Sequence, residues 1–311
     1  SMKSKLLFFF AILLISAASF LLLSLSATAS TTDVPQLVYL PIVTKTFRSF
    51  NLIYIPAGEF SMGCDSQHNG GYECLPDEEP LHTVYLDAYL IDATEVTNVH
   101  YSQCVAGGSC TAPGLSSSYT RESYYDNPEF ADYPVTYVDW YQAQAFCIWA
   151  GGSLPTEAQW EKAARGSADT RAFPWGDTFP DCTLANFFDA YELGGYCVGD
   201  TTAVGSYPSG ASPYGLLDMA GNVWEWVQDW YSDTYYSTYP YDNPTGPATG
   251  ISKIVRGGSW MNCWYAIRTA DRHEFQPELT ETVIDDEYTV GFRCAVDLHS
   301  TYLPLVTLNS P

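Results

Sequence analysis

Apolar and polar residues alternate along the first part of the chain in the way expected for short strands. The stretch LIYIPAGEFSMG, residues 52–63, alternates on both sides of an interruption at residues 56–58. A second run, HTVYLDAYLID at 82–92, follows the acidic segment PDEEP. Because each run is short and turn-forming residues bound it, the pattern predicts strands at both places before any helix begins.

Helical signals come next. A helix is expected from Thr97 to a glycine pair at 107–108. Asp139 is placed to cap residues 140–150, and Thr156 with Gln159 forms a capping box that opens residues 157–165. Glycine follows each run and should end each helix. Beyond residue 166, Gly, Pro, Tyr and Asp are frequent, so only short strands are expected there.

The composition narrows the possible partners and surroundings. The 311 residues contain 36 Asp and Glu against 13 Lys and Arg, which gives a net charge of −23. Such a surface repels phosphate backbones and argues against a nucleic-acid partner. It suits an extracellular protein and calcium held by oxygen atoms. The 24 Tyr and 9 Trp favour a loop-rich domain held together by aromatic packing.

The N-terminus has the pattern of a secretory signal peptide. Lys3 and Lys5 precede an apolar run over 6–25, and the small-x-small sequence at 27–29 follows it. Cleavage after Ala29 predicts a secreted or cell-envelope protein without a membrane span. The alternative is an uncleaved anchor, because the apolar run is long enough to cross a bilayer.

The rest of the chain divides into three parts. Residues 50–297 are expected to form one domain, between an extension at 30–49 and a tail at 298–311. Both flanks contain a similar YLP sequence, at 38–44 and 301–307. Their prolines limit them to edge strands, so they either lie side by side or dock onto an envelope partner.

Nine cysteines in an exported chain predict disulfides and one unpaired thiol. Spacing alone does not fix the connectivity, but short Gly-rich loops favour three local pairs. Cys147 and Cys294 would then form a disulfide between distant parts of the chain, and Cys263 would remain unpaired. The local pairs are Cys64–Cys74, Cys104–Cys110 and Cys182–Cys197.

Seven motifs occur along the chain in a fixed order. They are IPAGEFSMG, TEVTN, YPVTYVDWYQAQAFCIWAGGSLPTEAQWEKAARG, PWGD, SPYGLLDMAGNVWEWVQDWY, VRGGSW and VGFRCA. The series resembles the formylglycine-generating enzyme, or sulfatase-modifying factor, family from Asn51 to Val296. The resemblance implies a single α+β domain with little regular secondary structure, related to the C-type lectin fold. It also implies the Cys147–Cys294 disulfide.

The sequence departs from this family at the positions of the metal ligands. Catalytic members of the family oxidise a sulfatase cysteine to formylglycine with oxygen and copper(I), which two cysteines hold. The matching positions here are Asn262 and Ile267, and Cys263 lies one residue late. In an extended segment that shift turns the side chain to the opposite face. These departures argue against copper and against the family's reaction.

Cys263 alone is a catalytic candidate only if nearby cations activate its thiol. It would otherwise bind a metal with His273 and Asn262, form an intermolecular disulfide, or be a small buried apolar side chain. The cysteine count favours the last interpretation.

Calcium is the cofactor that the resemblance implies, as one or two ions. For one site it assigns the side chains of Asp218 and Glu225 with the backbone carbonyls of Gly221 and Val223. The mixture of carboxylate and carbonyl oxygens in a tight turn suits this hard cation. A second site would begin at Asn186 and the Phe187 carbonyl, with Gly199 and Asp200 as substitutes for ligands that do not align.

Two functions follow from these observations. The first is an exported binding or scaffold module that recognises a protein or peptide partner through residues 260–285. The alternative is an oxidoreductase, which would generate formylglycine or perform another oxidation with altered metal ligands. In the binding module, Arg268 and Arg272 would pair with acidic groups of the partner. The cleft would comprise Ser259, Trp260, Asn262, Trp264, Tyr265, Arg268 and Arg272.

Overall fold

The computed structural model describes residues 51–191, 194–278 and 289–298, which all fall within one compact unit. The expected signal peptide, the N-terminal extension and the tail beyond Leu298 lie outside these residues. In the described part of the chain, no helix has the length and apolar character needed to cross a membrane.

The strands predicted before the first helix are confirmed. β1 (Leu52–Ile55) pairs antiparallel with β4 (Tyr89–Asp92), and β2 (Gly58–Met62) pairs antiparallel with β3 (His82–Leu86). β11 (Ala295–Asp297) adds to the other edge of β4. The two ends of the described chain therefore meet in one three-stranded sheet.

The three helices begin at the predicted caps. α1 spans Asn98–Ala106, α2 spans Trp140–Ala150 and α3 spans Glu157–Arg165. Both expected capping boxes form, at Asp139 and at Thr156, and satisfy backbone N–H groups that the first helical turn leaves free. Short 3-10 helices lie in the connections: Pro76–Glu78 (η1), Pro128–Phe130 (η2), Pro208–Gly210 (η3), Tyr235–Thr238 (η4) and Trp264–Ile267 (η5).

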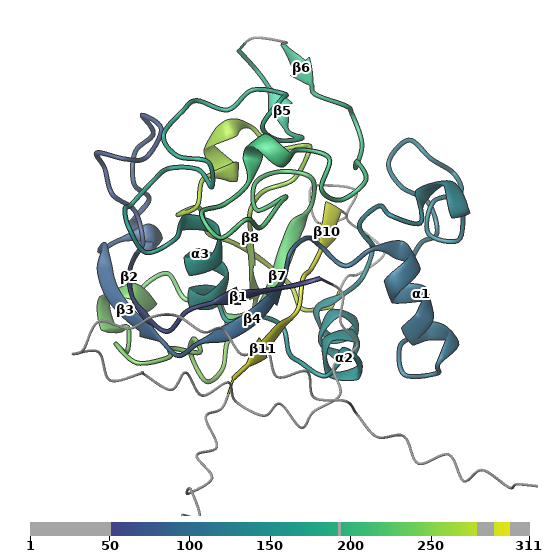
Figure 1. Ribbon diagram of the computed structural model, residues 1–311, viewed down its shortest axis with the longest axis horizontal. Coiled ribbons are helices and arrows are strands. Elements are labelled where there is room, and N and C mark those ends of the chain that lie inside the picture. The colour runs from purple at the N-terminus through teal and green to yellow at the C-terminus, as the bar shows by residue number, and fades with distance from the viewer. Residues whose placement is uncertain (1–50, 192–193, 279–288, 299–311) are drawn as a thin grey trace, which may run out of the picture. The chain divides into compact units, whose positions relative to one another are not determined.

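A four-stranded sheet lies between the helices, in the order β10, β7, β8, β9 (Figure 1). β10 runs parallel to β7, and the other two pairs are antiparallel. A small hairpin of β5 and β6 lies apart from it. The strands are Phe188–Asp189 (β5), Gly195–Tyr196 (β6), Trp224–Trp230 (β7), Lys253–Arg256 (β8), His273–Phe275 (β9) and Val290–Gly291 (β10).

The alternation along β7 builds two apolar cores on opposite faces of this sheet. Trp224 and Trp226 pack into one core with α1 and α2. Val227 packs into the other with α3 and strands β1 to β4. Figure 1 shows α2 and α3 on either side of β7. The residues are buried on both faces, so the sheet is the central layer of the domain.

α3 is buried over its whole surface, although its sequence predicts only one apolar face. Its charged residues find partners inside the protein. Glu157 pairs with Arg272 at 2.7 Å and Glu161 with Arg256 at 2.5 Å. The Lys162 ammonium donates to the backbone carbonyls of Pro56, between β1 and β2, and of Gly58, the first residue of β2. The apolar pattern could not reveal this, because the partners come from distant parts of the sequence.

The cysteine predictions are confirmed. The four disulfides are Cys64–Cys74, Cys104–Cys110, Cys147–Cys294 and Cys182–Cys197, and Cys263 is a free thiol.

The disulfides should differ in their effect on stability according to the loop that each closes. Cys147–Cys294 joins residues 147 apart, whereas Cys104–Cys110 joins residues 6 apart. Loop-closure entropy predicts a loss of about 5 kcal/mol for the double alanine variant of the first pair and about 2 kcal/mol for the second. Urea unfolding monitored by tryptophan fluorescence measures both. Equal losses would contradict the prediction.

Candidate functional site

The candidate site is the segment that leaves β8, with sequence GGSWMNCWYAIR at 257–268. Gly257 and Gly258 both have positive φ angles, of 90° and 69°. A side chain at Gly258 would place its Cβ 2.7 Å from the carbonyl oxygen of Ala266. The glycine pair therefore lets the chain turn back and pack closely against its own continuation.

The two positions that match the copper ligands have other tasks here. The Asn262 side-chain oxygen accepts hydrogen bonds from Ser259 N–H and Oγ–H, at 2.9 and 2.7 Å, and so belongs to the turn. Ile267 is fully buried in an apolar cluster with Phe187 and Trp264. An amide held within a turn and a buried alkyl side chain are not ligands for copper(I).

Cys263 is half-buried and extended, and it forms an isolated parallel bridge with Phe188. Its thiol lies within hydrogen-bonding distance of the Tyr265 hydroxyl, and burial together with this thiol raises the pKa of Tyr265. Within the described residues, only Cys64, Cys74 and Glu78 bring three possible metal-binding side chains close together, and their sulfurs form a disulfide. In the part of the chain that the structure describes, the other eight cysteines are all in disulfides, so none of them offers Cys263 a second thiolate.

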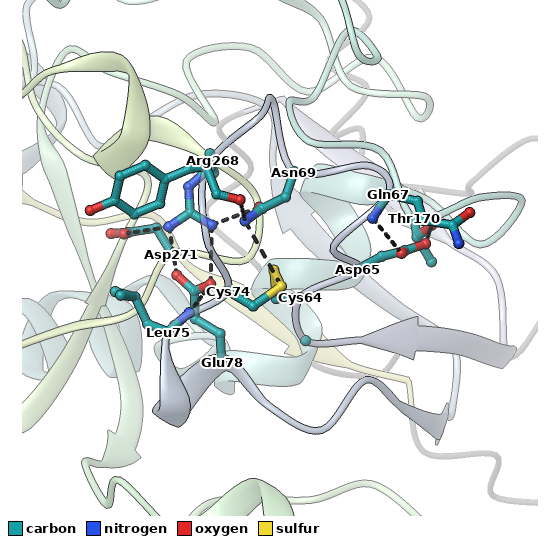
Figure 2. Close-up of a disulfide and its surroundings, with 12 residues drawn as sticks. Cys64, Asp65, Gln67, Asn69, Cys74, Leu75, Glu78, Thr170, Arg268 and Asp271 are labelled. Atoms are coloured by element: carbon teal, nitrogen blue, oxygen red, sulfur yellow. Dashed lines mark hydrogen bonds and ion pairs between the residues drawn. A yellow bond between two sulfur atoms is a disulfide. The ribbon is translucent and has the colours of Figure 1, made fainter.

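Arg268 is fully buried and organises this part of the domain (Figure 2). Its guanidinium forms a two-pronged ion pair with Glu78, at 2.6 and 3.1 Å, and also donates to Asn69 at 2.6 Å. Asp271 lies 3.2 Å away, and burial raises the pKa of this carboxyl. Arg268 therefore fastens the loop of the Cys64–Cys74 disulfide to the candidate site.

Arg272 is also turned inward. It pairs with Glu157 at 2.7 Å, donates to the Asp77 carbonyl at 2.7 Å and lies over the Tyr236 ring. The expectation that Arg268 and Arg272 face acidic groups of a partner is wrong, because both guanidinium groups are buried and paired with carboxylates of the domain itself.

Aromatic side chains cover the segment instead. Five of them are exposed, from 41 % for Tyr265 to 70 % for Tyr191. Trp260 and Trp264 lie beneath them, so these two tryptophans, like Ser259, are buried and do not themselves form the outer face. We call the five exposed residues the aromatic surface: Tyr119, Phe179, Tyr191, Tyr196 and Tyr265.

Ring contacts connect the aromatic surface to the segment. Tyr119 and Tyr196 each lie 5.2 Å from Trp260, and Phe179 lies 5.1 Å from Trp264, measured between ring centres. Most of these residues come from outside 260–285, where the sequence placed the recognition surface, and residues 279–285 lie outside the described part of the chain. The sequence signal for such a surface was the high tyrosine content, but composition does not show which tyrosines are exposed together.

The carboxylates assigned to calcium lie near one another around a fully buried arginine. Glu225 pairs with Arg293 through both oxygens and also accepts from the Trp160 indole at 2.8 Å. Asp218 has a positive φ of 57° and accepts from Gly205 N–H at 2.6 Å. Glu95, which the sequence did not single out, lies within hydrogen-bonding range of Asp218.

The second calcium site is less complete. The side-chain oxygen of Asn186 is buried and has no partner among the described residues. The Phe187 carbonyl accepts from Cys197 N–H at 3.0 Å. The Asp200 carboxylate accepts from Ser118, Thr120 and Arg121, and calcium at this second site stays a prediction.

A model of the sulfatase-modifying factor enzyme 1-like domain matches residues 43–298. The chain belongs to the sulfatase-modifying factor family. The formylglycine-generating enzyme of Streptomyces coelicolor is 33 % identical over 297 residues, which cover 80 % of this chain and 90 % of the enzyme. The serine/threonine-protein kinase pkn1 of Chlamydia pneumoniae is 34 % identical over 272 residues, 83 % of this chain. This match spans only 39 % of the kinase's length.

The solved structures show the same fold. PvdO from Pseudomonas aeruginosa superimposes with a TM-score of 0.62 at 27 % identity, over 79 % of this chain and 94 % of PvdO. The expected α+β class and family are therefore confirmed. Within this sulfatase-modifying factor domain, the departures lie at Asn262, Cys263 and Ile267, at and beside the positions where the family resemblance places the copper ligands.

The role of Arg268 in this domain can be tested by its effect on stability. Arg268→Leu leaves Glu78 as a buried, unpaired carboxylate, so we expect a loss of about 3–5 kcal/mol in the free energy of unfolding. The control is Arg171→Leu, which removes a partly exposed pair with Asp169 and should cost less than about 1 kcal/mol. If Arg268→Leu were as stable as the wild type, Arg268 would again be a candidate for binding a partner.

The Glu157 network also predicts a pH dependence. Asp229 is buried and accepts from Glu157 N–H, and burial, with the Glu157 charge second, raises its pKa to about 7. Its native pKa exceeds its unfolded value, so its contribution to stability is complete below about pH 4 and is lost as the pH rises through about 7. Asp229→Asn should therefore raise the melting temperature at pH 8 and have little effect at pH 4.

Calorimetry between pH 4 and 8 measures this difference. The control is Asp181→Asn, because hydrogen bonds from Thr183 lower the pKa of Asp181 and its loss should act in the opposite direction. A constant offset between wild type and Asp229→Asn at all pH values would contradict the assignment.

Proposed function

We propose that this sulfatase-modifying factor domain is an exported binding module that recognises a protein or peptide through the aromatic surface. The observation that carries the proposal is the replacement of the two metal-binding positions at the centre of the site. Asn262 and the buried Ile267 stand where the oxidases hold copper, and exposed aromatic rings cover this segment. The four disulfides support export, because such bonds persist in oxidising compartments.

The chemistry of the aromatic surface favours a neutral or basic partner. Tyrosine rings offer large contact areas with few rotatable bonds and a hydroxyl for hydrogen bonding. Arg268 and Arg272 are buried, and the chain carries a net charge of −23. An acidic partner would be repelled, whereas lysine or arginine side chains would be attracted and would also stack on tyrosine faces.

The buried indole N–H of Trp260 gives further support for recognition at this place. It has no acceptor among the described residues, and Tyr119 and Tyr196 lie over the ring. A buried donor without a partner costs free energy, which an incoming acceptor would recover. We therefore expect a partner with a carbonyl or hydroxyl group to reach between the two tyrosines.

A second candidate function is an oxidation with altered ligands. The likeness to the Streptomyces coelicolor enzyme favours it, as does the contact between the Cys263 thiol and the Tyr265 hydroxyl. Without a second sulfur beside Cys263, we expect this activity to be absent.

One assay separates the two functions. The protein is incubated with a peptide that carries the sulfatase CxPxR sequence, with copper and oxygen, and mass spectrometry follows conversion of the peptide cysteine to the aldehyde. We expect no aldehyde above the level of a Cys263→Ser variant. Aldehyde formation that depends on Cys263 would falsify the binding-module proposal.

The aromatic surface is tested by substitution. Tyr191→Ala with Tyr265→Ala should weaken capture of a partner from envelope extracts at least tenfold, because a central tyrosine in an interface contributes about 1.4 kcal/mol or more. The control is Tyr141→Ala, a tyrosine on α2 that is 47 % exposed and lies outside the aromatic surface. Equal capture by both variants would remove the aromatic surface from the proposal.

Calcium is part of the same proposal, as an ion that stabilises the domain. The family resemblance assigns it to Asp218, Glu225 and the carbonyls of Gly221 and Val223. Of the two carboxylates in this set, Glu225 already pairs with Arg293, and Asp218 accepts from Gly205 N–H.

A further inference from the structure

A pocket of about 240 Å³ lies among the connections at one end of the domain. The turn between β3 and β4, the start of α3, the loop at 243–245 and the end of β11 form its walls. In Figure 1 the end of β11 lies at the bottom of the picture, whereas β6, which contains Tyr196, lies at the top. The pocket shares no residue with the aromatic surface, and its size suits a compact ligand smaller than a drug molecule.

The polar lining of the pocket is acidic and contains no basic side chain. Asp87 and Asp297 both line it. Each carboxylate accepts one side-chain hydrogen bond from an amide, Asp87 from Asn243 at 3.1 Å and Asp297 from Gln159 at 2.7 Å. Among the described residues, neither carboxylate has an ion-pair partner. Each therefore keeps an oxygen that can accept hydrogen bonds from a ligand.

The ammonium group that reaches a lining residue from inside the protein is already engaged. Lys253 donates to the backbone carbonyl of Gln228 at 2.7 Å. Its Nζ atom also lies 3.9 Å from the ring centres of both Trp140 and Trp230, so cation–π contacts hold it away from the pocket.

A third carboxyl adjoins the pocket. Asp229 is 1 % exposed and accepts from Glu157 N–H, next to the lining residue Thr156. It also touches Gly246, next to the lining residue Thr245, where an added Cβ would lie 2.7 Å from the Cβ of Asp229. Its Oδ1 atom is buried and receives no hydrogen bond from the described residues. Whenever Asp229 is ionised, it adds to the attraction of a positive charge toward the pocket.

The apolar part of the lining suits an aliphatic stem. Leu86, Pro244 and Leu298 supply it. The methylene stem of an amine can pack on such a surface while its charged head meets carboxylates. No aromatic ring lines the pocket, so it lacks the platform that quaternary ammonium ligands use.

We propose that this pocket binds a primary aliphatic amine, with its ammonium group on Asp87 and Asp297 and its stem against Leu86, Pro244 and Leu298. An ammonium group carries three N–H donors, which match the acceptor oxygens of the two carboxylates. A free small amine and the lysine side chain of a protein share this chemistry. The site is separate from the aromatic surface and gives the domain a second ligand.

Isothermal calorimetry on the full chain at pH 7.5 tests the proposal, in physiological salt to screen non-specific attraction to the acidic surface. Diaminobutane represents a free amine, and Nα-acetyl-lysine amide represents a protein lysine. We expect saturable binding of an amine and no binding of butanediol, which has hydroxyls in place of the amino groups. Asp87→Asn combined with Asp297→Asn should weaken amine binding at least tenfold, because both charges are lost while size is kept.

Asp126→Asn is the matched control, because Asp126 is also an exposed acid that accepts one side-chain hydrogen bond, from Ser123, but lies outside the pocket. It should leave binding unchanged. The melting temperature checks that the double variant folds, and Ala88→Lys, which places a cation of the protein's own at the lining, should also abolish binding.

The tighter binder of the two amines identifies the source of the ligand. The proposal is overturned if neither amine binds, if butanediol binds equally well, or if Asp126→Asn loses as much affinity as the double variant. None of these results bears on partner capture by the aromatic surface.

Discussion

Four buried arginines, each paired with a glutamate, hold this domain together. Arg256, Arg268, Arg272 and Arg293 come from the C-terminal part of the chain, and each pairs with a glutamate far away in the sequence. A charge in a protein interior is tolerated only when a partner and further hydrogen bonds compensate it. The positions of α3, the Cys64–Cys74 loop and the segment after β8 are therefore coupled, because moving any of them would separate a buried pair.

This coupling explains why a segment without regular structure has a defined shape. Residues 257–263 form no strand or helix, yet Arg256 precedes them and Arg268 follows them. Both guanidinium groups are fully buried and hydrogen-bonded on several sides. The segment between them is thus fixed at both ends, and the Ser259–Asn262 turn fixes its middle. A rigid scaffold of this kind can present side chains to a partner at a small entropic cost.

Local signals predicted much of the fold. The caps at Asp139 and Thr156, the strand breaks and the three local cysteine pairs each depend on residues close in sequence, and the structure confirms them. The inward direction of Arg268 and Arg272 was not predictable, because Glu78 and Glu157 lie more than a hundred residues away. The aromatic surface was not predictable for the same reason, because separate loops supply its residues. Glu95 was overlooked because a single acid in a strand-to-helix connection carries no local signal.

Two of the exposed tyrosines, Tyr191 and Tyr196, lie inside the loop that the Cys182–Cys197 disulfide closes. The hairpin there is only two residues long on each side, too little to hold a shape by itself. Presentation of these rings consequently depends on the redox state of their surroundings. Under the proposed export, the disulfide would form after the chain leaves the reducing interior of the cell, and the loop that carries both rings would be closed only then.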